Sequence, residues 1–167
     1  MDKEYSVLDG TDLILSVNNA ALGFSTSCKV STSVELGQRI TKETSSGKWP
    51  EKYVKSFSEK ITADGCVLKN GDTNVPTYDE LKELMLAETP IEAMYSLRDG
   101  NKRTGKTAGG YKGKFLITSL DLDGPGGDDA KYSVGLESSG KVEKIGNGLN
   151  ENEVVQAAQG AAPAAQV

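Results

Sequence analysis

Strict alternation of apolar and polar side chains over residues 22–36 is the clearest pattern in the chain. The even positions carry Leu, Phe, Cys, Val or Thr, and the odd positions carry Gly, Ser, Lys or Glu. Such period-2 alternation is typical of a β-strand with one buried face and one wetted face. Its length is well beyond the usual strand of about 5–6 residues. The pattern predicts one long strand over Leu22–Leu36 with its even positions in a core.

Shorter alternating or apolar runs predict further strands. They lie at 13–17, 53–61, 66–68, 91–97, 115–122, 132–136 and 142–145, with turns at Asn18-Asn19 and at 63–65. Asn tolerates positive φ, which favours a two-residue turn after the first strand. The apolar run at 115–122 predicts a strand buried on both faces for part of its length. Residues 142–145 are the candidate partner of 132–136.

One helix is predicted between these strands. Thr77 and Glu80 have the spacing of a capping box, and an apolar stripe follows until Thr89-Pro90 ends it. The stripe consists of Tyr78, Leu81, Leu84 and Met85. A helix of about three turns needs a sheet to pack against. The fold class predicted is therefore mainly β, a β-sandwich or open barrel with one short flanking α-helix.

Two polar segments interrupt or follow this pattern. Residues 37–52 predict a long loop because they are charged and contain Gly47 and Pro50. Trp49, the sole tryptophan, either folds back onto its own domain or docks on a partner subunit. We expect residues 1–149 to form one β domain and the Ala/Gln-rich residues 150–167 to form a disordered tail.

Composition removes many chemistries. The chain of 167 residues has no His and 2 Cys, which excludes His-dependent catalysis and a four-thiolate zinc site. Its net charge of −5 argues against a dedicated nucleic-acid binder. No signal peptide or membrane span is evident, so we expect a soluble protein made in a cytoplasm. In that compartment Cys28 and Cys66 are expected to be buried and reduced, with a disulfide between them as the minor alternative.

Residues 100–107 match the phosphate-binding pattern G-x-x-x-x-G-K-[ST]. A functional P-loop requires a helix that starts at the lysine, whereas Gly109, Gly110 and Gly113 follow here. We therefore expect a basic hairpin connection and no enzyme. The acidic turns at 121–124 and 127–129 could bind calcium, but Pro125 and the lack of a closing Glu favour solvated turns. We predict no catalytic residue, no cofactor and no metal.

The succession of segments resembles the major tail tube proteins of long-tailed bacteriophages. The resemblance covers roughly residues 7–146, and its pieces are short. They are Gly10–Val17, Leu22-Gly23-Phe24, the loop Thr41–Trp49, Ser58–Leu68, the helix residues Tyr78–Leu81 and the strand-turn-strand unit Lys114–Gly140.

The resemblance implies a structural virion protein that self-assembles into stacked, hexameric rings, with strands from every subunit forming a continuous inner barrel. Leu22–Leu36 and Tyr53–Ile61 would be barrel strands, the helix would pack outside, and the loop would bridge to the next ring. The implied lumen-facing residues are Ser25, Ser27, Lys29, Ser31, Ser33 and Glu35. The implied inter-ring loop residues are Lys42, Glu43, Lys48, Trp49, Glu51 and Lys52.

The implied partners are other copies of the chain, other tail proteins such as the tape measure and terminator and, where there is one, a sheath. Double-stranded DNA would pass through the tube without specific binding, and the chain would not insert into a membrane. It would be made in the host bacterial cytoplasm and reside in the virion tail. Two alternatives stay open: the inner tube of a contractile injection or secretion system, and a monomeric β-sandwich binding module such as an adhesin or carbohydrate-binding domain.

Overall fold

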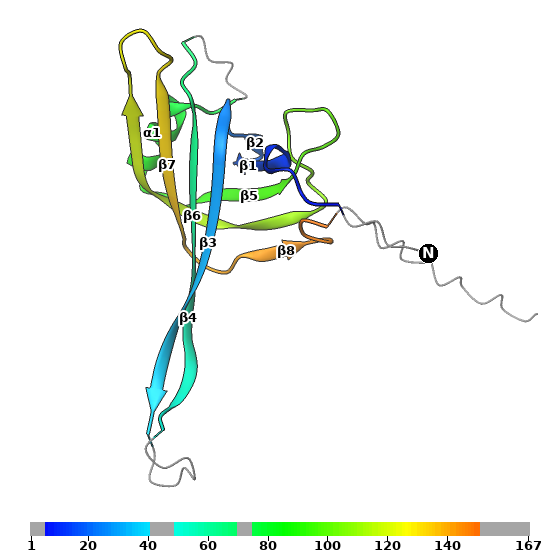
Figure 1. Ribbon diagram of the computed structural model, residues 1–167. Coiled ribbons are helices and arrows are strands. Elements are labelled where there is room, and N and C mark those ends of the chain that lie inside the picture. Colours follow the sequence, from blue (N-terminus) through cyan, green and yellow to red (C-terminus); the bar gives the residue numbers. More distant parts are fainter. Residues whose placement is uncertain (1–5, 41–48, 70–74, 151–167) are drawn as a thin grey trace, which may run out of the picture.

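The computed structural model describes residues 6–40, 49–69 and 75–150 of the chain (Figure 1). These residues form mainly antiparallel β-structure with one short α-helix, as the sequence predicts. The elements are a 3-10 helix (Gly10–Asp12), β1 (Leu13–Val17), β2 (Ala20–Ala21), β3 (Ser25–Arg39), β4 (Glu51–Cys66), α1 (Tyr78–Leu86), β5 (Ile91–Leu97), β6 (Gly110–Asp123), β7 (Lys131–Ser138) and β8 (Glu143–Ile145).

All strands belong to one sheet with the order β2-β1-β5-β6-β7-β4-β3, and β8 pairs with β6. The long strand β6 connects the two halves of this sheet, because Tyr111–Phe115 pair with β5 and Phe115–Asp123 pair with β7. Figure 1 shows the two halves crossing, with β3, β4 and β7 running roughly perpendicular to β5 and β8. The result is a folded-over, sandwich-like sheet with the core between its halves.

The core is built from apolar side chains of both halves. Leu15, Ile91 and Ala93 come from one half, and Ile61 and Leu136 come from the other. Phe115 lies at the junction and is fully buried. The sequence alternates at these strands because only one face of each strand is covered.

Helix α1 covers part of this core through Leu81, which is fully buried. The predicted capping box is confirmed: the Glu80 carboxylate accepts hydrogen bonds from the backbone N–H and the hydroxyl of Thr77, both at 3.0 Å. In the part of the chain that the structure describes, no helix is long and apolar enough to cross a membrane.

The β3–β4 hairpin is much longer than the sheet that supports it. The two strands pair from Ser25↔Gly65 to Arg39↔Glu51, whereas β7 pairs only with Lys60–Cys66. Residues 32–39 and 51–59 therefore project from the body as a two-stranded extension, which we call the arm (Figure 1). This extension is the dominant departure from a compact sandwich.

The structure corrects three predicted strand bounds. The long strand begins at Ser25 and not at Leu22, because Phe24 has a positive φ of 44° that breaks the extended backbone. The loop predicted at 37–52 is shorter than expected, since the backbone pairing between β3 and β4 extends to Arg39 and Glu51 despite the polar side chains there. Glu51 and Lys52 consequently lie in β4 and not in a loop.

Three further predictions were wrong. The turn at 63–65 does not exist: β4 runs straight through it, and Gly65 is there because the Tyr132 ring lies against its Cα. Strand β8 pairs with β6, because both edges of β7 are already taken by β4 and β6. In β6, Phe115 is buried but Leu116 is exposed, so this strand is covered on one face only. The Asn18-Asn19 turn is confirmed, with φ of 49° and 66°.

Candidate assembly surfaces

A polar face covers the side of the β6-β7-β4-β3 half that points away from the core. On β3 it carries the predicted lumen-facing residues Ser27, Lys29, Ser31, Ser33 and Glu35, all exposed. Ser25 is also exposed, but a register shift between Ser25 and Ser27 interrupts the alternation there. The structure thus brings five of the predicted residues onto one surface.

Side chains of β4 complete this polar face and were missed by the sequence analysis. Ser27 donates to Asp64 Oδ2 at 2.6 Å, and the Ser33 and Ser58 hydroxyls lie 2.7 Å apart. Lys29 pairs with Thr62 between these two hydrogen-bonded pairs and makes the polar face continuous. The missed residues on β4 are Ser56, Ser58, Lys60, Thr62 and Asp64. Their alternation with Phe57, Ile61 and Ala63 was the signal that could have found them.

Charges on this face are held by local hydrogen bonds. Glu35 accepts hydrogen bonds from Lys55 Nζ at 2.9 Å and from the Ser56 hydroxyl at 3.1 Å. Both bonds lower the pKa of Glu35, and the bond from Lys55 has the larger effect. Hydrogen bonds also lower the pKa of Asp64, and the bond from Ser27 has a larger effect than the bond from Ser133. Both carboxylates are therefore ionised at neutral pH, so the face is hydrated and carries charge of both signs.

The opposite face of the arm is apolar and exposed. Cys28 and Val30 of β3 pack against the core as predicted, but the alternation continues into the arm, where no core lies beneath it. We call this surface the arm face; its residues are Val34, Leu36, Val54 and Phe57, with exposed fractions of 46%, 51%, 50% and 72%. Contiguous exposed apolar residues of this kind mark an interaction surface.

Several strand edges are unpaired in the part of the chain that the structure describes, and two of them lie at the two ends of the β6-β7-β4-β3 order. β3 pairs only with β4, which leaves its other edge free along Ser25–Arg39. Beyond Phe115, β6 pairs only with β7, which leaves the edge of Leu116–Asp123 free. A long free edge is a template for pairing with another chain.

The predicted inter-ring residues fall on or near the tip of the arm. Lys42, Glu43 and Lys48 lie outside the described residues. Trp49 is 79% exposed, so its ring is not buried against its own domain. Glu51 and Lys52 pair with Arg39 and Gln38 as the last rungs of the arm.

The segment that matches the P-loop pattern is a connection between β5 and β6. Arg98 and Gly105 form an isolated β-bridge within it, and β6 begins at Gly110 with no helix between them. The required phosphate-binding helix start is therefore missing, as the sequence analysis expected. Both thiols, Cys28 and Cys66, are free, and burial raises the pKa of Cys28 to about 11.

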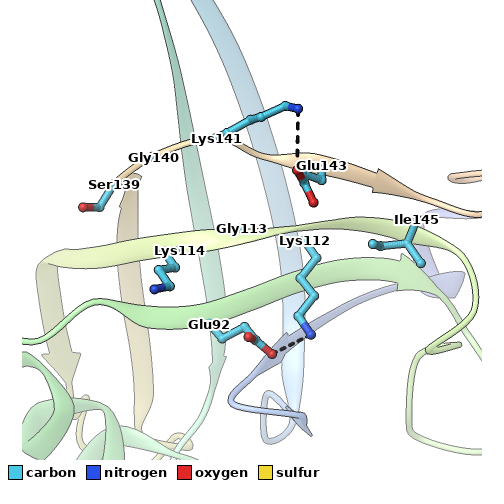
Figure 2. Close-up of a pocket in the computed structure, with 9 residues that line it drawn as sticks. All are labelled: Glu92, Lys112, Gly113, Lys114, Ser139, Gly140, Lys141, Glu143 and Ile145. Atoms are coloured by element: carbon cyan, nitrogen blue, oxygen red, sulfur yellow. Dashed lines mark ion pairs between the residues drawn. The ribbon is translucent and has the colours of Figure 1, made fainter.

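An open cleft of about 270 Å³ lies between β5, β6 and the segment that leads into β8 (Figure 2). Two ion pairs lie in its lining, Lys112–Glu92 at 2.7 Å between β6 and β5 and Lys141–Glu143 at 3.5 Å within the segment that leads into β8. Lys114 also lines the cleft. Its charges are largely neutralised internally, and the lining offers no nucleophile with an adjacent base.

Comparison with protein families identifies residues 7–144 as a phage tail tube protein. The chain belongs to the phage tail tube protein family. Proteins of this family are structural components of the virion tail and are not enzymes, in agreement with the sequence analysis. A search of curated proteins finds no match.

Solved structures of low sequence identity share the fold. A chain from the virion of a native gene transfer agent particle is 21% identical, with a TM-score of 0.64, covering 83% of this chain and 99% of that chain. The SPP1 tail tube is 10% identical, with a TM-score of 0.58 and coverage of 86% and 81%. The baseplate of the anti-feeding prophage gives 10% identity, a TM-score of 0.57 and coverage of 86% and 97%.

Proposed function

We propose that this tail tube protein forms hexameric rings that stack into a tube, and that double-stranded DNA passes through the tube into the host cell. The free edges of β3 and of β6 at Leu116–Asp123 carry this proposal. In a ring, the free edge of β3 in one subunit would pair with the Leu116–Asp123 edge of β6 in the next. The Leu116–Asp123 edge and the stretch of β3 that faces it would then be paired, which removes an exposed ladder of the isolated chain.

Strand direction supports this pairing. Neighbouring strands in β6-β7-β4-β3 are antiparallel, so β6 and β3, with two strands between them, also run in opposite directions. Rotation about a ring axis preserves the axial direction of each strand. The β3 edge of one subunit would therefore meet the β6 edge of the next as an antiparallel pair, which continues the existing pattern.

The polar face would line the lumen. It carries Ser27, Lys29, Ser31, Ser33 and Glu35, small or charged side chains that stay hydrated. On the opposite side of the same strands, Cys28, Val30 and Ile61 face the core. The net charge of −5 disfavours tight DNA binding and suits a conduit through which DNA must slide.

The arm would contact a neighbouring ring, with Trp49 and the residues at 42, 43, 48, 51 and 52 at that junction. Its exposed apolar face and exposed Trp49 are suited to burial between subunits. Other tail proteins, among them a tape measure, a terminator and, where there is one, a sheath, would bind the ends or outside of the tube. We propose synthesis in the host bacterial cytoplasm.

The inner tube of a contractile injection device is the second candidate, since the matched structures include the anti-feeding prophage baseplate. It requires the same rings and differs in cargo. The family match favours a tube subunit over the monomeric binding module.

Light scattering coupled to gel filtration, with negative-stain images of the same fractions, tests the proposal. We expect rings or tubes with sixfold symmetry. A paired labelling experiment tests the lumen, in a background with Cys28 and Cys66 replaced by Ala. A fluorophore at Ser31→Cys should be shielded in tubes from a quencher too large to enter them, whereas one at Glu88→Cys should stay accessible. Equal quenching of both labels would contradict the assigned lumen face.

A further inference from the structure

Lys29 is a charged side chain at the free edge of β3. It is exposed on the polar face, and its neighbour across the hairpin, Thr62, is neutral. Lys55 and Lys60, the lysines of β4 beside this face, each form an ion pair with a carboxylate of the same chain. Lys29 forms no ion pair with any of the described residues.

Two carboxylates lie at the free edge of β6. Asp121 and Asp123 are exposed, and within the described ranges neither forms an ion pair. Asp121 pairs with Ser133, which pairs in turn with Asp64, the acceptor of the Ser27 hydroxyl on the polar face. Directly opposite residues of neighbouring strands point to the same side of a sheet, so Asp121 also lies on the polar face. Asp123 shares that side because it is two residues further along the strand.

The cation and the two carboxylates lie at opposite ends of the β6-β7-β4-β3 order. Within one copy, β7 and β4 separate the two edges by three strand spacings, about 14 Å, so Lys29 does not reach the aspartates of its own chain. In a ring that joins the β3 edge of one copy to the β6 edge of the next, the polar face continues across the junction. Such a junction, which we call the seam, brings Lys29 beside Asp121 and Asp123 of the neighbouring copy.

The charges favour particular registers at the seam. An antiparallel pair that keeps its polar side chains on one face shifts only in steps of two residues, because a one-residue slip exchanges the faces. When Lys29 is opposite Asp121, Asp123 is on the diagonal, and when Lys29 is opposite Asp123, Asp121 is on the diagonal. Lys29 is therefore next to both carboxylates in either register. A shift toward the arm would place Glu35 opposite Asp121 instead, and directly opposed like charges are destabilising.

The apolar side of the seam agrees with the same two registers. They place Val30 of β3 opposite Leu120 or Leu122 of β6, and these leucines lie on the core side because they pair with the buried Val134 and Tyr132. Leu122 is 53% exposed in the single chain. The seam would thus cover an exposed apolar side chain on one side of the sheet and pair opposite charges on the other.

We propose that Lys29 of each subunit forms an ion pair with the Asp121 and Asp123 carboxylates of the next subunit, on the lumen side of the seam, and that this contact sets the register of β3 against β6. The proposal rests on the ring assembly proposed above. It also explains how a lysine is compatible with a surface along which DNA slides. A free cation there would bind phosphates, whereas a cation neutralised by two carboxylates adds little affinity for DNA.

Charge reversal at the two edges tests this contact. In Lys29→Glu, three carboxylates would meet at each seam, so we expect the concentration at half-assembly, measured by light scattering, to rise about tenfold, equivalent to about 1.4 kcal/mol. Combining Lys29→Glu with Asp121→Lys and Asp123→Lys restores opposite charges and should return assembly to within about threefold of wild type. Lys144→Glu, an exposed reversal on β8 outside both edges, is the matched control and should change assembly less than about twofold. Thermal midpoints of the unassembled variants separate effects on the single chain from effects on the seam.

Lys29→Glu chains that assemble at the wild-type concentration, or a triple variant that folds and assembles no better than Lys29→Glu, would overturn the proposal and leave the rings standing. A cryo-electron microscopy map of the wild-type assembly decides the question even if a variant folds poorly. Lys29 Nζ within about 4 Å of the Asp121 or Asp123 carboxylate of the next subunit would support the proposal, and a Lys29 with neither carboxylate in that range would overturn it. A wild-type chain that never forms rings or tubes would overturn both this contact and the proposed assembly.

Discussion

The buried hydroxyl of Tyr132 is predicted to lock the start of β3 onto the core. Tyr132 is 1% exposed, and its hydroxyl donates to the Gly23 carbonyl at 2.6 Å. Gly23 is buried and directly precedes Phe24, whose positive φ turns the chain into β3. Tyr132→Phe removes the donor and leaves the ring in place, so it isolates this one hydrogen bond.

The expected cost follows from the burial of both partners. A hydrogen bond contributes about 0.5–1.5 kcal/mol, and a buried acceptor left without a donor costs about 1–3 kcal/mol. We therefore expect Tyr132→Phe to lower the free energy of unfolding by about 1–2 kcal/mol. For a chain of this size, that loss corresponds to a fall in the thermal midpoint of roughly 2–8 °C.

Urea unfolding and thermal scans of the unassembled chain measure this change. Tyr78→Phe is the matched control, because within the described residues its hydroxyl accepts a hydrogen bond from the exposed Lys82 Nζ at 3.2 Å and from no other group. That control should change stability by less than about 0.5 kcal/mol. If Tyr132→Phe and Tyr78→Phe have equal effects, the hydrogen bond to Gly23 does not hold the start of β3.

Four further predictions follow from close packing, capping and exposure. Gly65→Ala should destabilise the chain by about 1–3 kcal/mol in urea unfolding, because its Cβ would lie 2.6 Å from the Tyr132 hydroxyl; an unchanged midpoint would contradict this contact. Thr77→Ala should cost about 1 kcal/mol through the lost cap. The hydrogen bond from the Thr77 backbone N–H is the main cause of the lowered pKa of Glu80. The stability that the Glu80 carboxylate contributes is therefore fully present above its ordinary pKa and is lost as the pH falls through its lowered pKa. The stability difference between wild type and Glu80→Gln should therefore shrink in acid, and a difference that grows would refute the cap. Phe57→Glu should leave the thermal midpoint of the single chain unchanged and abolish tubes in negative stain, because Phe57 is 72% exposed; intact tubes would remove the arm face from the interface.

Local signals in the sequence predicted the local elements well. Thr77 and Glu80 gave the helix start because a capping box acts within one turn. The Asn18-Asn19 turn was predictable for the same reason, since positive φ is a property of those residues. Tertiary contacts decided what the sequence analysis missed: Gly65 looked like a turn residue, but it makes room for Tyr132 in a continuous strand.

The arm face shows the main limit of the pattern. Alternation in β3 predicts that the face with Cys28, Val30 and Val34 is covered, but it does not tell whether the cover is the same chain or another copy. The structure separates the two cases, since Cys28 and Val30 pack against the core and Val34 is 46% exposed. The polar strip on β3 that we propose for the lumen was predictable, because polar alternation is visible in one strand. Their neighbours on β4 required the strand register, which a single strand does not contain.

The most direct test of the central claim is a cryo-electron microscopy reconstruction of the assembled wild-type chain. The account predicts a hollow tube of hexameric rings in which the β3 edge of each subunit pairs antiparallel with the Leu116–Asp123 edge of β6 in the next. The side chains of Ser31 and Lys29 should face the lumen. A chain that remains monomeric at every concentration, or a tube in which β3 edges stay unpaired and the polar face points outward, would contradict it.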